Sequence, residues 1–217
     1  MTRLRKSSRI WSDPASRDDA RRVTIEPGPE LFAIDLAEIF GRRAPVEIEL
    51  GAGKGEFIVE RARECPGHDF LAVELSAAVV RVLAVRCGRA NLTNLRVVRM
   101  DARPLVNLML PADSVRAFHI YFPDPWPKER HTKHRLFTPG FAASLLRALE
   151  PDGIAFVATD VRERAEEIFP TLAAAGFVHT AEVPPGATRT GFARKYAAAG
   201  KPVYAASFRA IERSRRD

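Results

Sequence analysis

A glycine-rich turn is the first part of the chain whose residues could bind a ligand. Residues 49–55 read E-L-G-A-G-K-G and run directly into a segment of helical period. Glycines let a backbone turn tightly and let a ligand approach without a Cβ in the way. The spacing is G-x-G-x-G, and Glu56 stands where a dinucleotide-binding turn carries its last glycine. The turn therefore predicts a nucleotide-like cofactor but argues against a dinucleotide.

Three acidic residues mark the ends of three successive β-type runs. Glu49 lies inside the end of the first run, where a carboxylate would repel a pyrophosphate but could bind an ammonium group. Glu74 ends the second run and can accept hydrogen bonds from both hydroxyls of a ribose. Asp101 follows the third run and could accept from the exocyclic amine of adenine. S-adenosylmethionine carries all three groups, so the trio predicts that cofactor, with Gly51 and Gly53 in the turn beside it. For each acid taken singly, a solvated charge at a strand end is the alternative.

A proline-rich run is the second segment that could do chemistry. Residues 122–135 read F-P-D-P-W-P-K-E-R-H-T-K-H-R. Three prolines fix φ along the run, so Asp124 and Trp126 are presented with little conformational freedom. Lys128 and the basic residues after it could bind phosphates. The alternative is a rigid surface loop with a packed tryptophan and solvated charges, which explains Trp126 well and Asp124 poorly.

A metal site is not expected in this run or elsewhere. His131 and His134 lie three residues apart, but no carboxylate or cysteine ligand set accompanies them. The two cysteines, Cys65 and Cys87, lack metal-type C-x-x-C spacing, and neither a zinc site nor a disulfide scaffold is expected from them. We therefore predict phosphate contact or solvent exposure for the two histidines.

Charge and composition set broad limits on the function. The 217 residues are 46% hydrophobic, enough for one sizeable core. A formal charge of +7 favours a polyanionic partner such as nucleic acid, although a GC-rich genome, which favours arginine codons, is an alternative explanation. No apolar run reaches the length of a membrane span, and the basic leader Met1 to Trp11 lacks the apolar stretch of a signal peptide. We expect a cytoplasmic protein without membrane contact.

Short β-branched runs alternate with helical segments from Val46 onward, which is typical of a parallel sheet joined by crossover helices. The expected strands cover Val46 to Leu50, Asp69 to Glu74, Leu95 to Met100, Val115 to Phe122, Gly153 to Thr159, Phe177 to Val183 and Val203 to Ile211. One helix is expected directly after the first strand, and a second helix after the second strand, with Ser76 as its N-terminal cap. Two further helices are expected over Pro139 to Leu149 and Val161 to Ala175. The last two strands are expected to pair antiparallel. Because ligands gather at the carboxyl ends of parallel strands, the residues after each strand are the candidate site.

The domain organisation follows from the same pattern. Residues 1–45 are expected to form a basic N-terminal arm and lead-in helix, partly flexible, and residues 46–217 a single domain. Neither charge nor pattern reports the oligomeric state, so monomer and homodimer both stay open.

Taken together, these motifs resemble the bacterial tRNA (guanine-N7)-methyltransferase family. The resemblance rests on E-L-G-x-G-x-G, the strand ends V-E-L and D-A, the run F-P-D-P-W-P-K-x-R-H-x-K-x-R, A-T-D at 158–160 and a C-terminal T-x-F-x-x-K-Y. It covers nearly everything from about Val46 to the end. It implies a Rossmann-like class I methyltransferase: a mostly parallel seven-stranded sheet with helices on both faces and a C-terminal antiparallel strand pair. It also implies methylation of a variable-loop guanosine of tRNA at N7.

The resemblance assigns roles to individual residues. By it, Glu49, Glu74, Asp101 and Asp124 line the cofactor site together with Ala102, and Asp124 also takes part in catalysis. It further places Lys128, Asp160, Thr190, Phe192 and Lys195 at the RNA substrate. One residue departs from the family pattern, because Ala193 stands where T-x-[YF]-E-x-K carries a glutamate. A carboxylate there could accept from the N1 and N2 protons of guanine.

Three other functions compete with this interpretation. The missing glutamate could mark a catalytically altered RNA-binding homologue. A nicotinamide-dependent oxidoreductase shares the glycine turn and Glu74, but Glu56 argues against it. A small-molecule methyltransferase is disfavoured by the basic run after Asp124.

Overall fold

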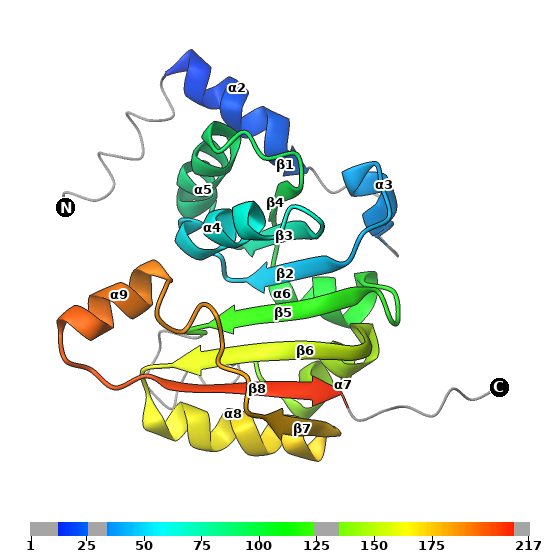
Figure 1. Cartoon of the computed structure of the whole chain (residues 1–217), viewed down its shortest axis with the longest axis vertical. Helices are drawn as coiled ribbons and strands as arrows, with labels where there is room; N and C mark the ends of the chain where they lie inside the picture. The colour runs from blue at the N-terminus through cyan, green and yellow to red at the C-terminus, as the bar shows by residue number, and fades with distance from the viewer. Residues whose placement is uncertain (1–12, 26–33, 124–134, 211–217) are drawn as a thin grey trace. The chain divides into compact units, whose positions relative to one another are not determined.

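The computed structural model describes residues 13–25, 34–123 and 135–210. The chain divides into two compact units, Met1–Ala102 and Arg103–Asp217, which are described separately below (Figure 1). Among the helices of the described residues, none is both long enough and apolar enough to cross a membrane.

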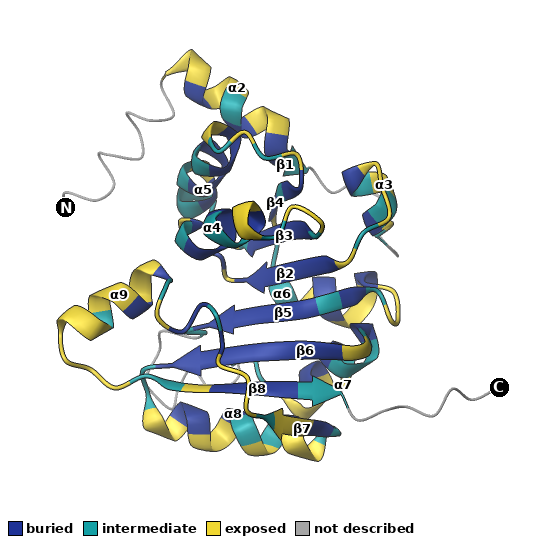
Figure 2. Cartoon of the chain, viewed as in Figure 1, coloured by how far each residue is buried: buried dark blue, intermediate teal, exposed yellow. Residues whose placement is uncertain are grey.

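The first unit is built on four parallel strands in the order β1-β4-β3-β2. They are β1 (Thr24–Ile25), β2 (Val46–Leu50), β3 (Asp69–Glu74) and β4 (Leu95–Arg99). Every residue of β2 is buried, including two glutamates, and so is every residue of β3 except the last (Figure 2). The apolar residues 70–73 of β3 are typical of a parallel strand that is covered on both faces. The predicted bounds of β2 and β3 are confirmed, and β4 ends one residue earlier than expected.

The helices of the first unit cover this sheet. They are α2 (Pro14–Val23), α3 (Leu36–Phe40), α4 (Glu56–Glu64) and α5 (Ala77–Arg89). Helix α5 packs on β3 and β4 and buries Leu83 completely, while α2 packs on α5. A Cβ at Gly88 would lie 2.0 Å from the carbonyl oxygen of Asp19, so α2 can approach α5 this closely only over a glycine. Part of the expected N-terminal arm is thus bound to the core of this unit.

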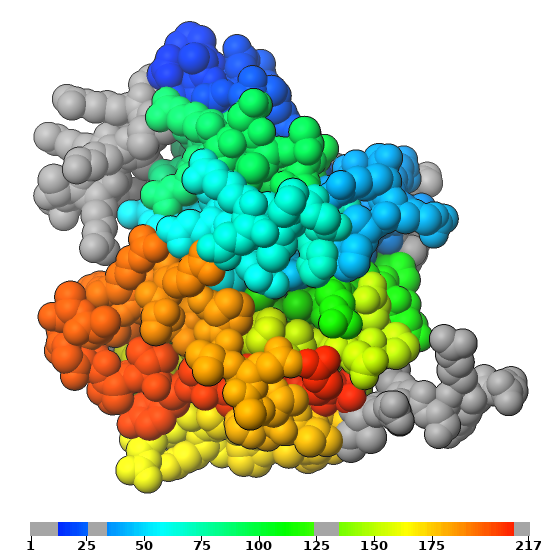
Figure 3. All heavy atoms as spheres, viewed as in Figure 1, coloured from blue at the N-terminus to red at the C-terminus, as the bar shows by residue number. Residues whose placement is uncertain are grey.

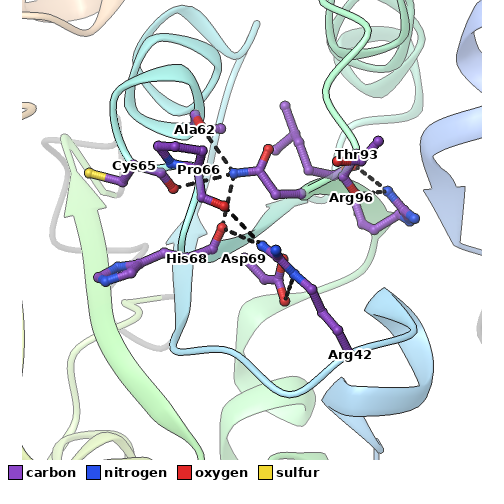
Figure 4. A network of polar contacts seen from close by, with 10 residues as sticks. Arg42, Ala62, Cys65, Pro66, His68, Asp69, Thr93 and Arg96 are labelled. Atoms are coloured by element: carbon purple, nitrogen blue, oxygen red, sulfur yellow. Dashed lines mark hydrogen bonds and ion pairs between the residues drawn. The ribbon is translucent and has the colours of Figure 1, made fainter.

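A polar network holds the amino ends of β3 and β4 (Figure 4). The Arg42 guanidinium donates to both carboxylate oxygens of the buried Asp69, at 2.7 Å from Nη2 to Oδ1 and 3.2 Å from Nε to Oδ2. The amide of Asn94, just before β4, donates to the backbone carbonyls of Ala62, Cys65 and His68. Buried polar groups are stable only when they have such partners. This end of the sheet is therefore structural, which leaves the opposite, carboxyl end for ligand binding.

The second unit carries a mixed set of strands and the remaining helices. Strand β5 runs parallel to β6, while β8 pairs antiparallel with both β6 and β7. Its elements are the π-helix η1 (Leu105–Met109), the strands β5 (Val115–Tyr121), β6 (Leu149–Thr159), β7 (Phe177–Thr180) and β8 (Tyr204–Ala210), and the α-helices α7 (Pro139–Ala148), α8 (Arg162–Ala174) and α9 (Gly191–Ala198). A short turn, α6 (Ala102–Pro104), precedes η1. The predicted antiparallel closing pair is confirmed, as is the mixed sheet with mostly parallel strands and crossover helices.

Several details differ from the prediction. The described residues contain eight strands rather than seven, because the two-residue β1 pairs with β4. Strand β6 begins four residues early, at Leu149, and β7 ends at Thr180 rather than Val183. Ser76 stands at the N-cap of α5, but its side chain makes no capping hydrogen bond. Helix α9 was not predicted at all.

Candidate cofactor and substrate sites

The glycine turn has the backbone shape that its sequence predicts. Gly51 and Gly53 have φ angles of 81° and 56°, which side-chain-bearing residues rarely adopt. The N–H groups of Gly51 and Ala52 both donate to the carbonyl oxygen of Val73, at 2.9 and 3.0 Å, which fixes the turn to the end of β3. A Cβ added at Gly51 or Gly53 would meet no atom within 4 Å. The surface above both glycines is therefore open to a ligand.

Glu49 is a buried carboxylate that lacks a full set of partners. Its residue is only 3% exposed, and its Oε2 atom has no hydrogen-bond partner in the described part of the chain. Burial raises the pKa of Glu49 well above its usual range, and the neighbouring charges of Glu56 and Glu74 raise it further. A backbone hydrogen bond from Ile58 acts in the opposite direction. A buried, unpaired carboxylate is costly, so this site is suited to a ligand that brings a cation.

Glu74 connects the glycine turn to the start of α5. Its Oε2 accepts from the N–H of Gly53 at 3.1 Å, and its Oε1 accepts from the N–H of Ser76 at 2.8 Å. Each carboxylate oxygen has two acceptor positions, so both can still accept from ribose hydroxyls. The neighbouring Glu56 is bound elsewhere, in an ion pair of 3.0 Å with Arg86 of α5.

Asp101 completes the set of acids at the carboxyl edge of the first unit. It lies two residues beyond β4 and is half-buried, and Ala102 follows it as the first residue of α6. Because β4, β3 and β2 are neighbours, the structure brings Glu49, Glu74 and Asp101 to one edge of the sheet. The glycine turn lies at the same edge.

The proline-rich run is largely outside the described residues. Asp124, Lys128, His131 and His134 all fall in the undescribed range 124–134. Arg135, expected among the cations for phosphates, instead pairs with Glu167 at 2.9 Å. In the described ranges, no group of three His, Cys, Asp or Glu side chains is placed to hold a metal ion.

The substrate residues expected in the second unit gather around α9. Asp160 is half-buried directly after β6, and the Tyr196 hydroxyl of α9 forms a hydrogen bond with it. Burial raises the pKa of Tyr196, and the charge of Asp160 raises it further. Phe192 and Lys195 are exposed on α9. The structure therefore brings Asp160 and the C-terminal motif together, although they are far apart in sequence.

A buried polar chain ties β5 to the loop before α9. The Tyr121 hydroxyl accepts from the N–H of Gly186 at 3.1 Å and forms a second hydrogen bond, of 2.9 Å, with Nδ1 of the buried His119. A Cβ at Gly186 would lie 2.1 Å from the Tyr121 ring, so only glycine allows this approach. The loop then continues to Thr190, whose N–H donates to the carbonyl of Gly186. Sequence reasoning did not identify these positioning residues.

Thr190 and Ala193 begin α9 as cap and third helical residue. The Thr190 hydroxyl accepts from the N–H of Ala193 at 3.0 Å, and Ala193 is only 1% exposed. A glutamate three residues after a threonine cap forms a capping box, in which its carboxylate reaches back to the N–H of the cap. Position 193 is thus buried in the helix start, which favours a capping role over base recognition for the glutamate that this chain lacks.

Removing the cap should weaken α9 directly. We expect Thr190→Ala to lower the free energy of unfolding by about 1 kcal/mol, because a helix N-terminal donor loses its acceptor. Amide hydrogen exchange in α9 should accelerate more than exchange in β5 or β6. Thr190→Ser, which keeps the hydroxyl, is the matched control, and equal exchange rates in the alanine and serine variants would contradict the capping role.

Known sequences similar to this chain are methyltransferases. A profile of the family described as putative methyltransferase matches residues 43–206. A tRNA (guanine-N(7)-)-methyltransferase of Nitrosomonas europaea is 42% identical over 149 residues, which cover 68% of this chain and 66% of that protein. Its counterpart in Nitrosomonas eutropha is 44% identical over 61% of this chain and 59% of that protein. The counterpart in Halorhodospira halophila is 41% identical over 81% of this chain and 79% of that protein. The chain thus spans between about three fifths and four fifths of these relatives.

Solved structures show the same fold at low sequence identity. The 16S rRNA methyltransferase KamB superposes with a TM-score of 0.60 and 16% identity, over 85% of this chain and 98% of that one. A SAM-dependent methyltransferase from Aquifex aeolicus superposes with a TM-score of 0.55 and 13% identity, over 94% of this chain and 98% of that one. At these identities the likeness concerns the fold, and it confirms the predicted Rossmann-like architecture.

Proposed function

This chain belongs to the tRNA (guanine-N7)-methyltransferase family, and on that premise we propose that it transfers a methyl group from S-adenosylmethionine to N7 of a guanosine in tRNA. The observation that carries the proposal is the buried Glu49 carboxylate, with an unpartnered oxygen, beside a glycine turn with open space above it. The family's members named above act on guanine N7 of tRNA, and a variable-loop guanosine is the target that we propose here.

The acids of the first unit fit this cofactor. S-adenosylmethionine supplies an electrophilic methyl group on a sulfonium when it is bound. Glu49 would hold its ammonium group, which supplies the cation that the buried carboxylate lacks. Glu74, already oriented by the turn and by α5, would accept from the ribose hydroxyls, and Asp101 from the adenine amine. Gly51, Gly53 and Ala102 would line the site with backbone.

Guanine N7 sets modest demands on the protein. It carries a lone pair and no proton, so no general base is needed before it attacks. Rate enhancement then comes from holding N7 in line with the methyl carbon and sulfur. The methylated ring is cationic, and we assign Asp124 to holding the base and stabilising that developing charge.

The partner in this proposal is tRNA, and no metal takes part. The formal charge of +7 supports binding of a polyanion, and Lys128 and Lys195 would contribute cations to it. We assign the other substrate contacts to Asp160, Thr190 and Phe192. We propose a cytoplasmic location, where tRNA is found, with the chain acting as a monomer or homodimer.

Lys128 should act on RNA affinity rather than on chemistry. We expect Lys128→Ala to reduce the slope of log affinity against log salt by about 0.9 or somewhat less, the contribution of one phosphate contact. The rate at saturating RNA should stay near that of the parent chain. The control is Arg162→Ala, because the exposed Arg162 is already paired with Glu166. A Lys128→Ala slope equal to the parent's would refute the phosphate contact.

The proposed activity is tested by transfer of labelled methyl from S-adenosylmethionine to bulk unmodified tRNA. Labelled tRNA supports the proposal, whereas unlabelled tRNA with tight RNA binding would identify a catalytically altered RNA-binding homologue. Thermal stabilisation by each cofactor tests the oxidoreductase alternative, since a ligand that binds the folded state raises its stability. Stabilisation by NAD but not by S-adenosylmethionine would indicate an oxidoreductase.

A further inference from the structure

Three aromatic rings lie together in the second unit, where β5 ends beside α9 (Figure 1). The Phe122 ring centroid is 5.3 Å from that of Tyr196 and 6.3 Å from that of Phe192, and the last two are 6.1 Å apart. We call these three residues the aromatic cluster. Phe192 is 50% exposed, so a ligand can reach its ring. Helix α9, in orange, lies on the surface seen in Figure 3.

Phe122 is held in the cluster by an unusual backbone. Its φ angle is 54°, in the left-handed region that bulky residues seldom adopt. Its N–H donates to the carbonyl of Ala158 at 2.7 Å, and the adjacent Tyr121 is anchored to Gly186. Such strain is retained where the surrounding structure holds it, and it concentrates at functional sites. The residue two positions later is Asp124, the proposed catalytic side chain.

Charged groups of both signs lie near the aromatic cluster: a carboxylate, which favours a cationic ring, and cations, which favour an attached phosphate. Asp160 accepts a hydrogen bond from the Tyr196 hydroxyl and so places a carboxylate at the rim of the aromatic cluster. The Lys201 ammonium already lies 5.3 Å from the Tyr196 ring centroid, which shows that the ring accepts a cation over its face. Arg194 and Lys195 are exposed on the same helix and can approach phosphates.

We propose that the aromatic cluster stacks the guanine base and binds the methylated, cationic base more tightly than the neutral one. This inference rests on the proposed function and specifies how the same site recognises its substrate. During transfer, the bond from sulfur to the methyl carbon breaks and the bond from that carbon to N7 forms. The sulfonium becomes a neutral thioether, the purine takes up the positive charge, and no proton moves. A cation-preferring aromatic surface therefore gains attraction for the base as the reaction proceeds.

The test compares two nucleotides that differ by the transferred methyl group. GMP and 7-methyl-GMP are titrated into the full chain by NMR, at slightly acidic pH, where the methylated base keeps its N1 proton and its positive charge. We expect 7-methyl-GMP to bind about two- to fivefold more tightly than GMP, the range of an exposed cation–π contact. Phe192→Leu should weaken both nucleotides by roughly tenfold, because a stacking ring is lost, and should bring their affinity ratio close to one.

Two further variants keep the result interpretable. Phe192→Trp enlarges the ring and should raise the affinity ratio above that of the parent chain. Val178→Ala is the matched control, because Val178 is also an exposed apolar residue of this unit, at 51%, but lies on β7. It should leave both affinities unchanged.

Each outcome decides one claim. A parent ratio of one, or a ratio that Phe192→Leu and Phe192→Trp both leave unchanged, overturns the role of the cluster even if tRNA is methylated. Absence of labelled methyl in tRNA overturns the proposed function, while the nucleotide ratio still reports on the cluster. A ratio that falls in Phe192→Leu and rises in Phe192→Trp supports the inference.

Discussion

Glu49→Gln should weaken S-adenosylmethionine binding by roughly 30-fold or more and at the same time make the unliganded protein more heat-stable. The loss in affinity follows because the cofactor's ammonium group would be buried against a neutral amide. The gain in stability follows because the fold no longer has to bury a carboxylate whose Oε2 lacks a partner. Calorimetric titration and thermal unfolding measure the two effects on the same samples.

The stability effect has a defined pH dependence. Burial raises the pKa of Glu49 in the folded chain, so the unfolded chain loses this proton at a lower pH than the folded chain does. The free energy of unfolding of the cofactor-free protein should therefore fall as pH rises from the usual carboxyl range through the raised pKa. Glu49→Gln should lack this decrease.

Glu47 provides a matched comparison on the same strand and the same face. It is equally buried, but its carboxylate accepts from Arg61 at 2.9 and 3.0 Å and lies 2.8 Å from Nδ1 of His68. Glu47→Gln should therefore destabilise the fold, by about 3 kcal/mol or more if it breaks the buried pair, with a much smaller change in cofactor affinity. If both glutamine variants were destabilised and both bound the cofactor normally, the assignment of Glu49 would be wrong.

Asp124→Asn should lower the single-turnover rate of methyl transfer by about 100- to 1,000-fold at saturating cofactor and RNA. The amide is close in size to the carboxylate but lacks the charge that stabilises the cationic ring. Binding of cofactor and tRNA should change far less, because the substitution removes an interaction that strengthens as the charge develops.

The control for this variant is Asp152→Asn. Asp152 is exposed and has a φ angle of 62°, which asparagine also tolerates. It should retain the parent rate. A full single-turnover rate in Asp124→Asn would show that the charge of Asp124 has no part in catalysis.

The strands were predictable where burial imposes a simple pattern. β3 has an apolar run, residues 70–73, that ends at its last residue Glu74, and β2 has β-branched residues and ends where the glycine turn begins. β1 was missed because two residues are too short to show any periodicity, and its place depends on pairing with β4. Helix α9 was missed because it begins with Gly191, a poor helix former, and depends on the Thr190 cap.

The site was predictable only in part, because some of its features depend on contacts between residues far apart in the sequence. Strand ends brought Glu49, Glu74 and Asp101 to one edge, as the sequence pattern indicated. The sequence could not show that Glu47 is paired while Glu49 is not, because the partners lie on α4 and in the following loop. The aromatic cluster depends on tertiary contact between the end of β5 and α9, so no local sequence pattern predicts it.

The most direct test of the central claim is to locate the methyl group in tRNA treated with the purified protein. Unmodified tRNA is incubated with labelled S-adenosylmethionine, digested to nucleosides and fragments, and analysed by mass spectrometry. We predict labelled 7-methylguanosine at a single guanosine of the variable loop. Label on another atom or another base, or tRNA without label under conditions in which the cofactor binds, would contradict the proposed function.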